Sequence, residues 1–156
     1  MNSIGNVIGE LCKVILPIPE ESYLGNIDSS IAICTLSSMD LLKKISNSYL
    51  LNHISIAGRL LSENKGIDSI IKYVNQNKKI KTIIVCGKEV LGHKAGHSLF
   101  ELHKNGIDNY ARIINSTSPD PFLAATKSEI NYFQNEINLI NIINEVNFDT
   151  IKKLVI

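Results

Sequence analysis

The 156-residue chain has the length of one ordinary domain, and 44% hydrophobic residues with a mean hydropathy of +0.08 indicate a globular protein with a real core. Its 16 Lys and Arg residues against 15 Asp and Glu residues give a formal net charge of +1, which excludes a strong global field toward nucleic acid or an anionic membrane. The expected partner is therefore a small molecule or another protein.

Cysteine usage and hydropathy bear on where the protein works. Cys12, Cys34 and Cys86 are widely spaced, form no CxxC pair and make an odd number, which favours a reducing compartment over a secreted disulfide framework. No segment approaches the roughly 20 apolar residues of a spanning helix, and the N-terminus lacks the basic and apolar regions of a signal peptide. We therefore expect a cytoplasmic location, with no membrane insertion and no binding to nucleic acid.

Short apolar runs rich in β-branched residues alternate with helical patterns along the chain. In chain order, the pattern predicts a strand at Ile31–Leu36, a helix at Met39–Leu51, a strand at Ile54–Ala57, a helix at Ile67–Asn75, a strand at Lys81–Cys86, a helix at His97–Asn105, a weaker strand at Arg112–Ile114 and a long helix at Lys127–Ile143. Strands joined by such crossovers predict a mostly parallel α/β sheet of Rossmann type, flanked by helices. We expect one domain over residues 1–156, with residues 1–16 as an N-terminal extension.

The loops that follow these strands are the expected ligand-binding region, because ligands of open α/β sheets bind outside the carboxyl ends of the strands. Four such loops are predicted to converge at one edge of the sheet: Leu36–Ser38, Gly58–Asn64, Gly87–Gly96 and Asn115–Pro119. A site at this edge would therefore draw on residues that are far apart in the sequence.

Familiar nucleotide-binding motifs do not fit these loops. The sequence SSMD follows the first strand and GKEVLGHKAG follows the third, and neither is the GxGxxG of a dinucleotide-binding turn. The segment Gly87–Lys94 also lacks the order and the Ser or Thr ending of a P-loop. Dinucleotide binding and nucleoside triphosphate hydrolysis are therefore disfavoured, and Cys86, at the end of a buried strand, is expected to be a small core residue.

Histidines are the remaining candidates for chemistry. His93 and His97 are four residues apart and could share a helix face as zinc ligands, with His103 as a candidate third, although no Glu lies between them to act as a general base. Alternatively, Gly92 and Gly96 let the backbone approach a bulky planar ligand while His93 is presented to it, which suits an axial metal ligand. The residues alone leave both interpretations open, beside that of an ordinary surface histidine.

Four segments carry a resemblance to a known family. They resemble the corrinoid-carrying A subunit of tetrahydromethanopterin S-methyltransferase from methanogenic archaea, and the resemblance covers residues Pro17 to Ile156. The segments are SYLGNIDSSIAICTLSS, IAGRLLSENKGIDSIIKYV, CGKEVLGHKAGHSLFELHKNGID and RIINSTSPDPF.

The resemblance implies a domain that binds a cobamide such as cobalamin. In that family a loop histidine is the lower axial ligand of cobalt, and it falls on His93 here; the cobalt carries a methyl group from methyl-tetrahydromethanopterin toward coenzyme M. A carboxylate is expected to fix the imidazole through its other nitrogen. Glu63 and Glu89 are the candidates, and Glu63 is favoured because it lies in the neighbouring strand-end loop. The other expected cofactor-binding residues are Leu36, Ser37, Gly58, Gly87, Gly92, Gly96 and Asn115.

The chain also departs from the family pattern. His97 stands where the family usually has Gln, Arg59 follows Gly58 in place of Pro, and Ile114–Asn115 replaces Gly-Ala. The chain stops at Ile156 without the C-terminal transmembrane helix of the membrane-bound members. We therefore expect a soluble relative that shuttles methyl groups with a separate soluble methyltransferase subunit. The alternatives are a histidine-ligated divalent-metal enzyme and a non-catalytic docking module.

Overall fold

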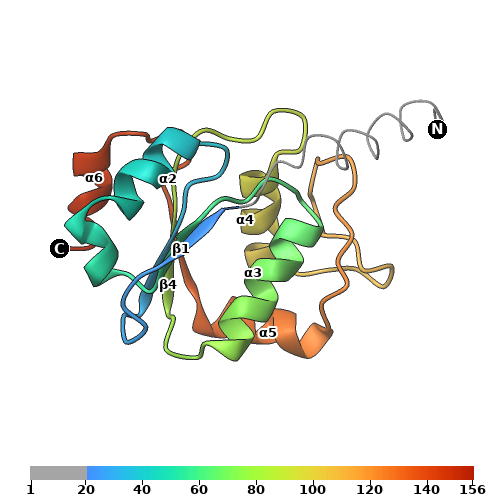
Figure 1. Ribbon diagram of the computed structural model, residues 1–156. Coiled ribbons are helices and arrows are strands. Elements are labelled where there is room, and N and C mark those ends of the chain that lie inside the picture. Colours follow the sequence, from blue (N-terminus) through green and yellow to red (C-terminus); the bar gives the residue numbers. More distant parts are fainter. Residues whose placement is uncertain (1–20) are drawn as a thin grey trace.

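Three of the apolar runs in the sequence become strands of a central sheet in a computed structural model that describes residues 21–156 (Figure 1). The five strands lie in the order β1-β3-β2-β4-β5. Their bounds are Ser22–Leu24 for β1, Ile31–Cys34 for β2, Ile56–Gly58 for β3, Thr82–Val85 for β4 and Asn138–Asn141 for β5. Strands β2 and β4 lie at the centre, and most of their residues are buried because both faces of the sheet are covered.

The sheet is mixed, where the sequence predicted a mostly parallel one. Strands β3, β2, β4 and β5 run parallel to their neighbours, whereas β1 pairs with β3 in the antiparallel direction. The edge strand escaped detection because it contains only three residues, with the half-buried Tyr23 between two exposed neighbours. Such a short strand has no apolar run that a sequence pattern could reveal.

Helices cover both faces of the sheet and make the protein a single α/β domain (Figure 1). One face carries α3 (Lys65–Gln76), α4 (Ala95–Asn105) and α5 (Lys127–Glu136), whose buried residues belong to the larger hydrophobic core. The other face carries α2 (Met39–Ser46), the 3₁₀ helix η1 (Tyr49–His53) and α6 (Phe148–Lys152), which build the second core. None of the helices in residues 21–156 has the length and apolar character needed to cross a bilayer.

Two elements of the sequence prediction were wrong. Arg112–Ile114 is not a strand of the sheet: its residues make only isolated bridges, Ile113 to Ile107 and Arg112 to Phe122. The fourth parallel strand is instead β5, which lies inside the predicted helix Lys127–Ile143. That helix ends at Glu136, and the buried Ile137 already has an extended backbone. The helical spacing of apolar residues continues past this point because Ile137 is buried although it lies outside the helix. The predicted extension at residues 1–16, with Cys12, lies outside the described residues.

The N-terminus of α5 carries a capping box that gives a stability prediction. Thr126 Oγ1 accepts a hydrogen bond from the Glu129 backbone N–H at 3.2 Å, and Glu129 Oε2 accepts one from the Thr126 N–H at 2.8 Å. We expect Thr126→Ala to lower the free energy of unfolding by about 1 kcal/mol. Urea denaturation measures this change, with the exposed Thr150→Ala in α6 as control. Equal unfolding midpoints for the two variants would contradict the prediction.

Candidate functional site

Three strand-end loops and one later segment meet at the carboxyl edge of the parallel strands. The loop after β2 is joined to the loop after β4, because Ser37 Oγ donates to the Lys88 carbonyl at 2.8 Å and the Lys88 N–H donates to Ser38 Oγ at 2.8 Å. The loop after β3 and the segment around residues 116–120 meet at Glu63. The predicted convergence of these loops is thus observed, although the last segment follows no strand of the sheet.

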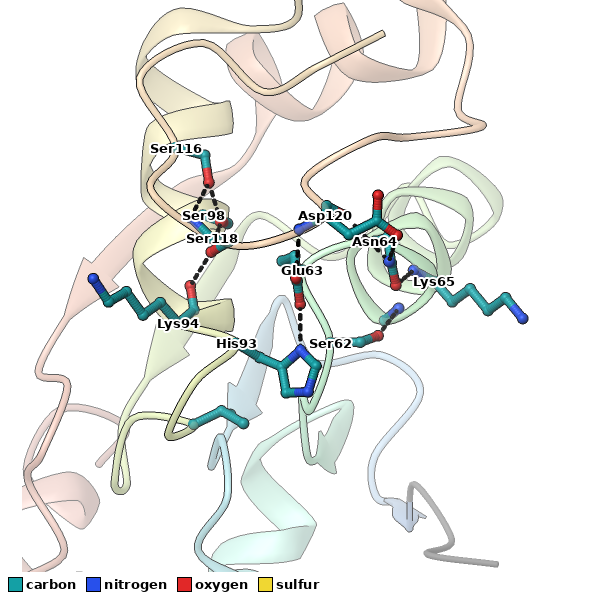
Figure 2. A network of polar contacts seen from close by, with 12 residues as sticks. Ser62, Glu63, Asn64, Lys65, His93, Lys94, Ser98, Ser116, Ser118 and Asp120 are labelled. Carbon is teal, nitrogen blue, oxygen red and sulfur yellow. Dashed lines mark hydrogen bonds and ion pairs between the residues drawn. The ribbon is translucent and has the colours of Figure 1, made fainter. Parts of the chain in front are cut away.

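A histidine–carboxylate pair lies where these loops meet. His93 Nδ1 lies 2.8 Å from Glu63 Oε2, and the other carboxylate oxygen accepts a hydrogen bond from the Asp120 backbone N–H at 2.9 Å. The Glu63 side chain is 1% exposed, whereas that of His93 is 57% exposed. Figure 2 shows Glu63 between Asp120 on one side and the imidazole on the other, with the second ring nitrogen turned away from the carboxylate. The pair therefore joins a buried acceptor to a solvent-facing ring.

The contacts of Glu63 define the tautomer of His93. An ionised carboxylate can only accept hydrogen bonds, so the proton of the neutral imidazole must lie on Nδ1 to bond to Glu63. Nε2 then carries a free lone pair, and within residues 21–156 it has no hydrogen-bond partner. A neutral imidazole with an exposed Nε2 lone pair is an available metal ligand.

The second candidate carboxylate, Glu89, closes the loop that carries His93. Its Oε1 accepts hydrogen bonds from the backbone N–H groups of Val90 at 2.8 Å and Gly96 at 3.0 Å, and its Oε2 accepts one from His97 at 2.8 Å. Lys94, the N-cap of α4, supplies no capping side chain, so Glu89 satisfies the free N–H groups of the first helical turn instead. Of the two carboxylates named from the sequence, Glu63 contacts His93 and Glu89 binds the start of α4.

The glycines of the predicted site have different surroundings. A Cβ on Gly87 would lie 2.1 Å from the Thr35 carbonyl oxygen, and one on Gly96 would lie 2.9 Å from Glu89 Oε2 and 3.1 Å from Leu36 Cδ1. Gly87 and Gly96 are therefore needed for packing within the protein. Gly92 has a φ of +80° and nothing within 4 Å of its Cβ position, so the backbone beside His93 is open to a ligand. A Cβ on Gly58 would lie 3.3 Å from Ser22 Cβ, beside the edge strand.

Three other predicted residues differ in burial and contacts. Leu36 is fully buried in the larger core, where its side chain offers no surface to a ligand. Ser37 uses its hydroxyl to join the loops after β2 and β4. Asn115 is exposed and has a left-handed backbone with a φ of 64°, which asparagine tolerates better than most residues.

The histidines of the zinc alternative bind different partners within the protein. His97 Nε2 accepts a hydrogen bond from the Thr117 N–H at 3.2 Å, and His103 Nε2 donates to the Ile137 carbonyl at 2.7 Å. Residues 21–156 contain no group of three or more His, Cys, Asp or Glu side chains placed to hold a metal ion. In the described part of the chain, His93, His97 and the candidate third ligand His103 are thus not brought together as one metal site.

Cys86 is fully buried at the end of β4, and burial raises the pKa of its thiol far above the ordinary value. A thiol held in its protonated form is a poor nucleophile. The interpretation of Cys86 as a core residue is therefore confirmed.

Sequence reasoning missed the residues that support the pair from behind, namely Asp120, Ser98, Ser116 and Ser118. Asp120 donates to Glu63, and the three serines form a buried cluster between α4 and the segment that leads to Asp120. The cluster carries no signal in the sequence, because Ser98 is an isolated serine of α4 and the other two lie in a loop, where serine is common. Asp120 does carry a signal in the sequence, because it lies between Pro119 and Pro121, which donate no backbone hydrogen bond.

Comparison with known proteins places the chain among methyltransferase subunits. Residues 16–156 match the family of the A subunit of tetrahydromethanopterin S-methyltransferase. The chain belongs to this family. It is 38% identical over 141 residues to the A subunit of the putative methyltransferase Mtx of Methanosarcina barkeri, covering 89% of this chain and 68% of the relative. It is 34% identical over 139 residues to A subunit 1 of the tetrahydromethanopterin S-methyltransferase of Methanothermobacter thermautotrophicus, covering 87% of this chain and 56% of the relative.

The residues that match the family include the whole candidate site, since every loop described above lies between residues 16 and 156. The Mtx relative from Methanosarcina acetivorans is 36% identical over 140 residues, with 89% of this chain and 67% of the relative covered. The chain thus spans about two thirds of the length of these Mtx subunits and little more than half of the Methanothermobacter subunit.

Proposed function

We propose that this protein is a corrinoid carrier of a methyltransferase system, with His93 Nε2 as the lower axial ligand of the cobalt in a bound cobalamin-type cofactor. One observation carries the proposal: the imidazole of His93 is fixed by the buried Glu63 through Nδ1, while its exposed Nε2 has a free lone pair. Membership of the family supports it, because these relatives are named as methyltransferase subunits.

The chemistry of the donor set fits such a cofactor. A single exposed imidazole is too few ligands for a bare divalent ion, which proteins commonly hold with about three or four side chains. It is sufficient for a metal whose equatorial ligands come from a macrocycle, and imidazole nitrogen suits mid-series metals such as cobalt. The open backbone at Gly92, next to His93, leaves room for a broad planar group to approach.

The residues of the site have separate tasks in this proposal. Glu63 keeps the proton of His93 on Nδ1 and makes Nε2 a stronger donor to the metal, as carboxylates behind metal-bound histidines do. Glu89 holds the loop closed at its base, so that His93 lies on a defined backbone. The bound cobamide would supply the metal that accepts and donates the methyl group, while the protein adjusts its axial ligand.

The wider setting follows from the same proposal. The protein would work in the cytoplasm, and its domain would be of Rossmann type. Its partner would be a soluble methyltransferase subunit. The Methanothermobacter relative is named for tetrahydromethanopterin, so methyl-tetrahydromethanopterin is the first methyl donor to test.

Electron paramagnetic resonance tests the axial ligand directly. The protein, labelled with ¹⁵N-histidine, is reconstituted with divalent cobalamin and freed of excess cofactor by desalting. We expect retained cobalt whose nitrogen splitting changes from the triplet of ¹⁴N to the doublet of ¹⁵N, because the coordinating nitrogen belongs to histidine. His93→Ala should lose this doublet.

His97→Ala is the matched control, since His97 lies four residues away and directs its Nε2 to Thr117. It should keep the doublet. A wild-type protein that retains no cobalt would contradict the carrier proposal. Retained cobalt with a splitting that histidine labelling leaves unchanged would contradict the role of His93.

A further inference from the structure

A buried chain of three hydroxyl groups connects α4 to the segment Ser116–Asp120, called here the brace segment. Ser98 Oγ lies 2.6 Å from both Ser116 Oγ and Ser118 Oγ, and Ser118 Oγ also contacts the Lys94 carbonyl oxygen at 3.2 Å. All three serines are at most 5% exposed. Figure 2 shows the cluster beside α4, with Lys94 at its lower end and His93 on the adjoining loop.

The direction of these hydrogen bonds is determined by their end point. A carbonyl oxygen only accepts, so Ser118 must donate to Lys94 and can only accept from Ser98. Ser98 has then used its single proton and accepts from Ser116, whose oxygen accepts in turn from the Ser118 N–H at 3.1 Å. Every hydroxyl proton is used, and the chain ends on the carbonyl of the residue that follows His93. Removing any one hydroxyl leaves a buried polar neighbour without its partner.

The other end of the brace segment holds Glu63. Asp120 lies between Pro119 and Pro121, and proline has no N–H, so the Asp120 N–H is the only backbone donor of these three residues. That donor bonds to Glu63 Oε1 at 2.9 Å. Asn64 Nδ2 in turn donates to the Asp120 carbonyl at 3.2 Å and to its Oδ2 at 3.0 Å. The two prolines restrict the backbone on both sides of the donor, which lowers the entropy lost on fixing it.

We infer that the brace segment positions the His93–Glu63 pair, with Ser118 and Asp120 as positioning residues that act from its two ends. Ser118 is the second donor to the Lys94 carbonyl, beside the Ser98 backbone N–H at 3.0 Å, and so helps to fix the left-handed backbone of Lys94, whose φ is 48°, next to His93. Asp120 fixes the carboxylate that receives the His93 proton. One short segment thus contacts the residue next to His93 and the carboxylate that binds the imidazole, and so links the two sides of the pair. The consequence for cofactor binding depends on the function proposed above, whereas the effect on the pair itself does not.

The tautomer of His93 in the cofactor-free protein is the decisive measurement. Two-bond ¹H–¹⁵N correlation spectra of ¹⁵N-histidine-labelled protein distinguish a proton on Nδ1 from one on Nε2. In the wild type we expect His93 to be mainly the Nδ1–H form at a pH at which the ring is neutral. Ser118→Ala should give a mixture of the two forms, because His93 Nδ1 and the Glu63 carboxylate are no longer held at hydrogen-bonding distance. Ser118→Thr keeps the hydroxyl and should restore the wild-type spectrum.

Two further variants test the Asp120 end of the brace segment. Asp120→Pro removes the N–H that bonds to Glu63, and Asp120→Ala removes only the side chain, so the proline variant alone should shift the tautomer. Ser55→Ala is the control for loss of a buried hydroxyl, since Ser55 precedes β3, is 5% exposed and lies outside this network. Corrinoid affinity should fall about tenfold in Ser118→Ala and stay unchanged in Ser55→Ala.

The outcomes separate this inference from the proposed function. Folded Ser118→Ala and Asp120→Pro proteins with the wild-type His93 tautomer would overturn the positioning role, whatever the cofactor does. If Ser118→Ala does not fold, the comparison of the two Asp120 variants decides on its own. A wild-type protein that binds no corrinoid would contradict the proposed function, and the tautomer spectra would still decide the role of the brace segment.

Discussion

Gly87→Ala is expected to lower the free energy of unfolding by at least about 3 kcal/mol, because two independent costs combine at this position. The backbone of Gly87 has a φ of +76°, which an L-residue adopts at a cost of about 1–2 kcal/mol. The new Cβ would also lie 2.1 Å from the Thr35 carbonyl oxygen and 2.8 Å from its carbonyl carbon, which are backbone atoms that no rotamer change can move. The loop after β4 would have to shift away from β2. Chemical denaturation and the expression of folded protein measure the loss.

Gly92→Ala is the matched control for this prediction. Gly92 has nearly the same φ, +80°, but nothing lies within 4 Å of its Cβ position. Only the backbone cost applies, so we expect a loss of about 1 kcal/mol and a folded protein. If both variants lost the same stability, the close approach of Gly87 to Thr35 would not be a determinant of the fold. The pair also identifies Gly92 as the glycine at which substitution tests ligand access, since Gly96 packs against Glu89 and Leu36.

The centre of the fold could be predicted from the sequence because strong local patterns agree with burial there. The runs that contain β2 and β4 are short, apolar and β-branched, and they lie at the middle of the sheet. Helix α3 buries Ile67, Ile71 and Val74, which repeat at helical spacing. Burial of apolar surface is the dominant force at these positions, and it produces the periodic pattern of apolar residues that the sequence shows.

The periphery could not be predicted, because weak local preferences were overruled by contacts with distant residues. From its sequence, Asn-Leu-Ile-Asn, strand β5 is predicted as a continuation of α5, because this is a poor strand pattern. It is a strand because its backbone forms hydrogen bonds with β4. Strand β1 is defined by its pairing with β3 alone. In both strands the deciding hydrogen bonds come from residues far away in the sequence.

The candidate site was partly foreseeable for a similar reason. That His93 and Glu63 would lie close together followed from topology, since their loops leave the carboxyl ends of β4 and β3, the two parallel strands on either side of β2. The role of Glu89 at the start of α4 and the supports behind Glu63 did not follow, because they depend on the exact path of two irregular segments. A strand order predicts which loops meet and leaves open which atoms touch.

Glu63→Gln is expected to lower corrinoid affinity by about 10–100-fold while the protein stays folded. The substitution keeps the size of a side chain that is 1% exposed, but it replaces one of two acceptor oxygens by an NH₂ group that only donates. Two donors meet the carboxylate in the wild type, the Asp120 N–H and the His93 Nδ1–H. The amide oxygen can satisfy only one of them. The backbone donor of Asp120 cannot change, so the NH₂ group should face His93.

The imidazole can answer this change by moving its proton. Nδ1 would then accept from the newly introduced amide, the proton would lie on Nε2, and the lone pair needed for an axial ligand would be lost. A dissociation constant from cobalamin titration measures the loss, and ¹H–¹⁵N spectra of the cofactor-free variant report the tautomer. Glu101→Gln is the control, because Glu101 lies on α4 and accepts a hydrogen bond from Asn105. A Glu63→Gln protein with wild-type affinity and an Nδ1–H ring would mean that the buried carboxylate does not select the state of His93, and the reason for burying an acid behind this loop would have to be sought in the Asp120 contact alone.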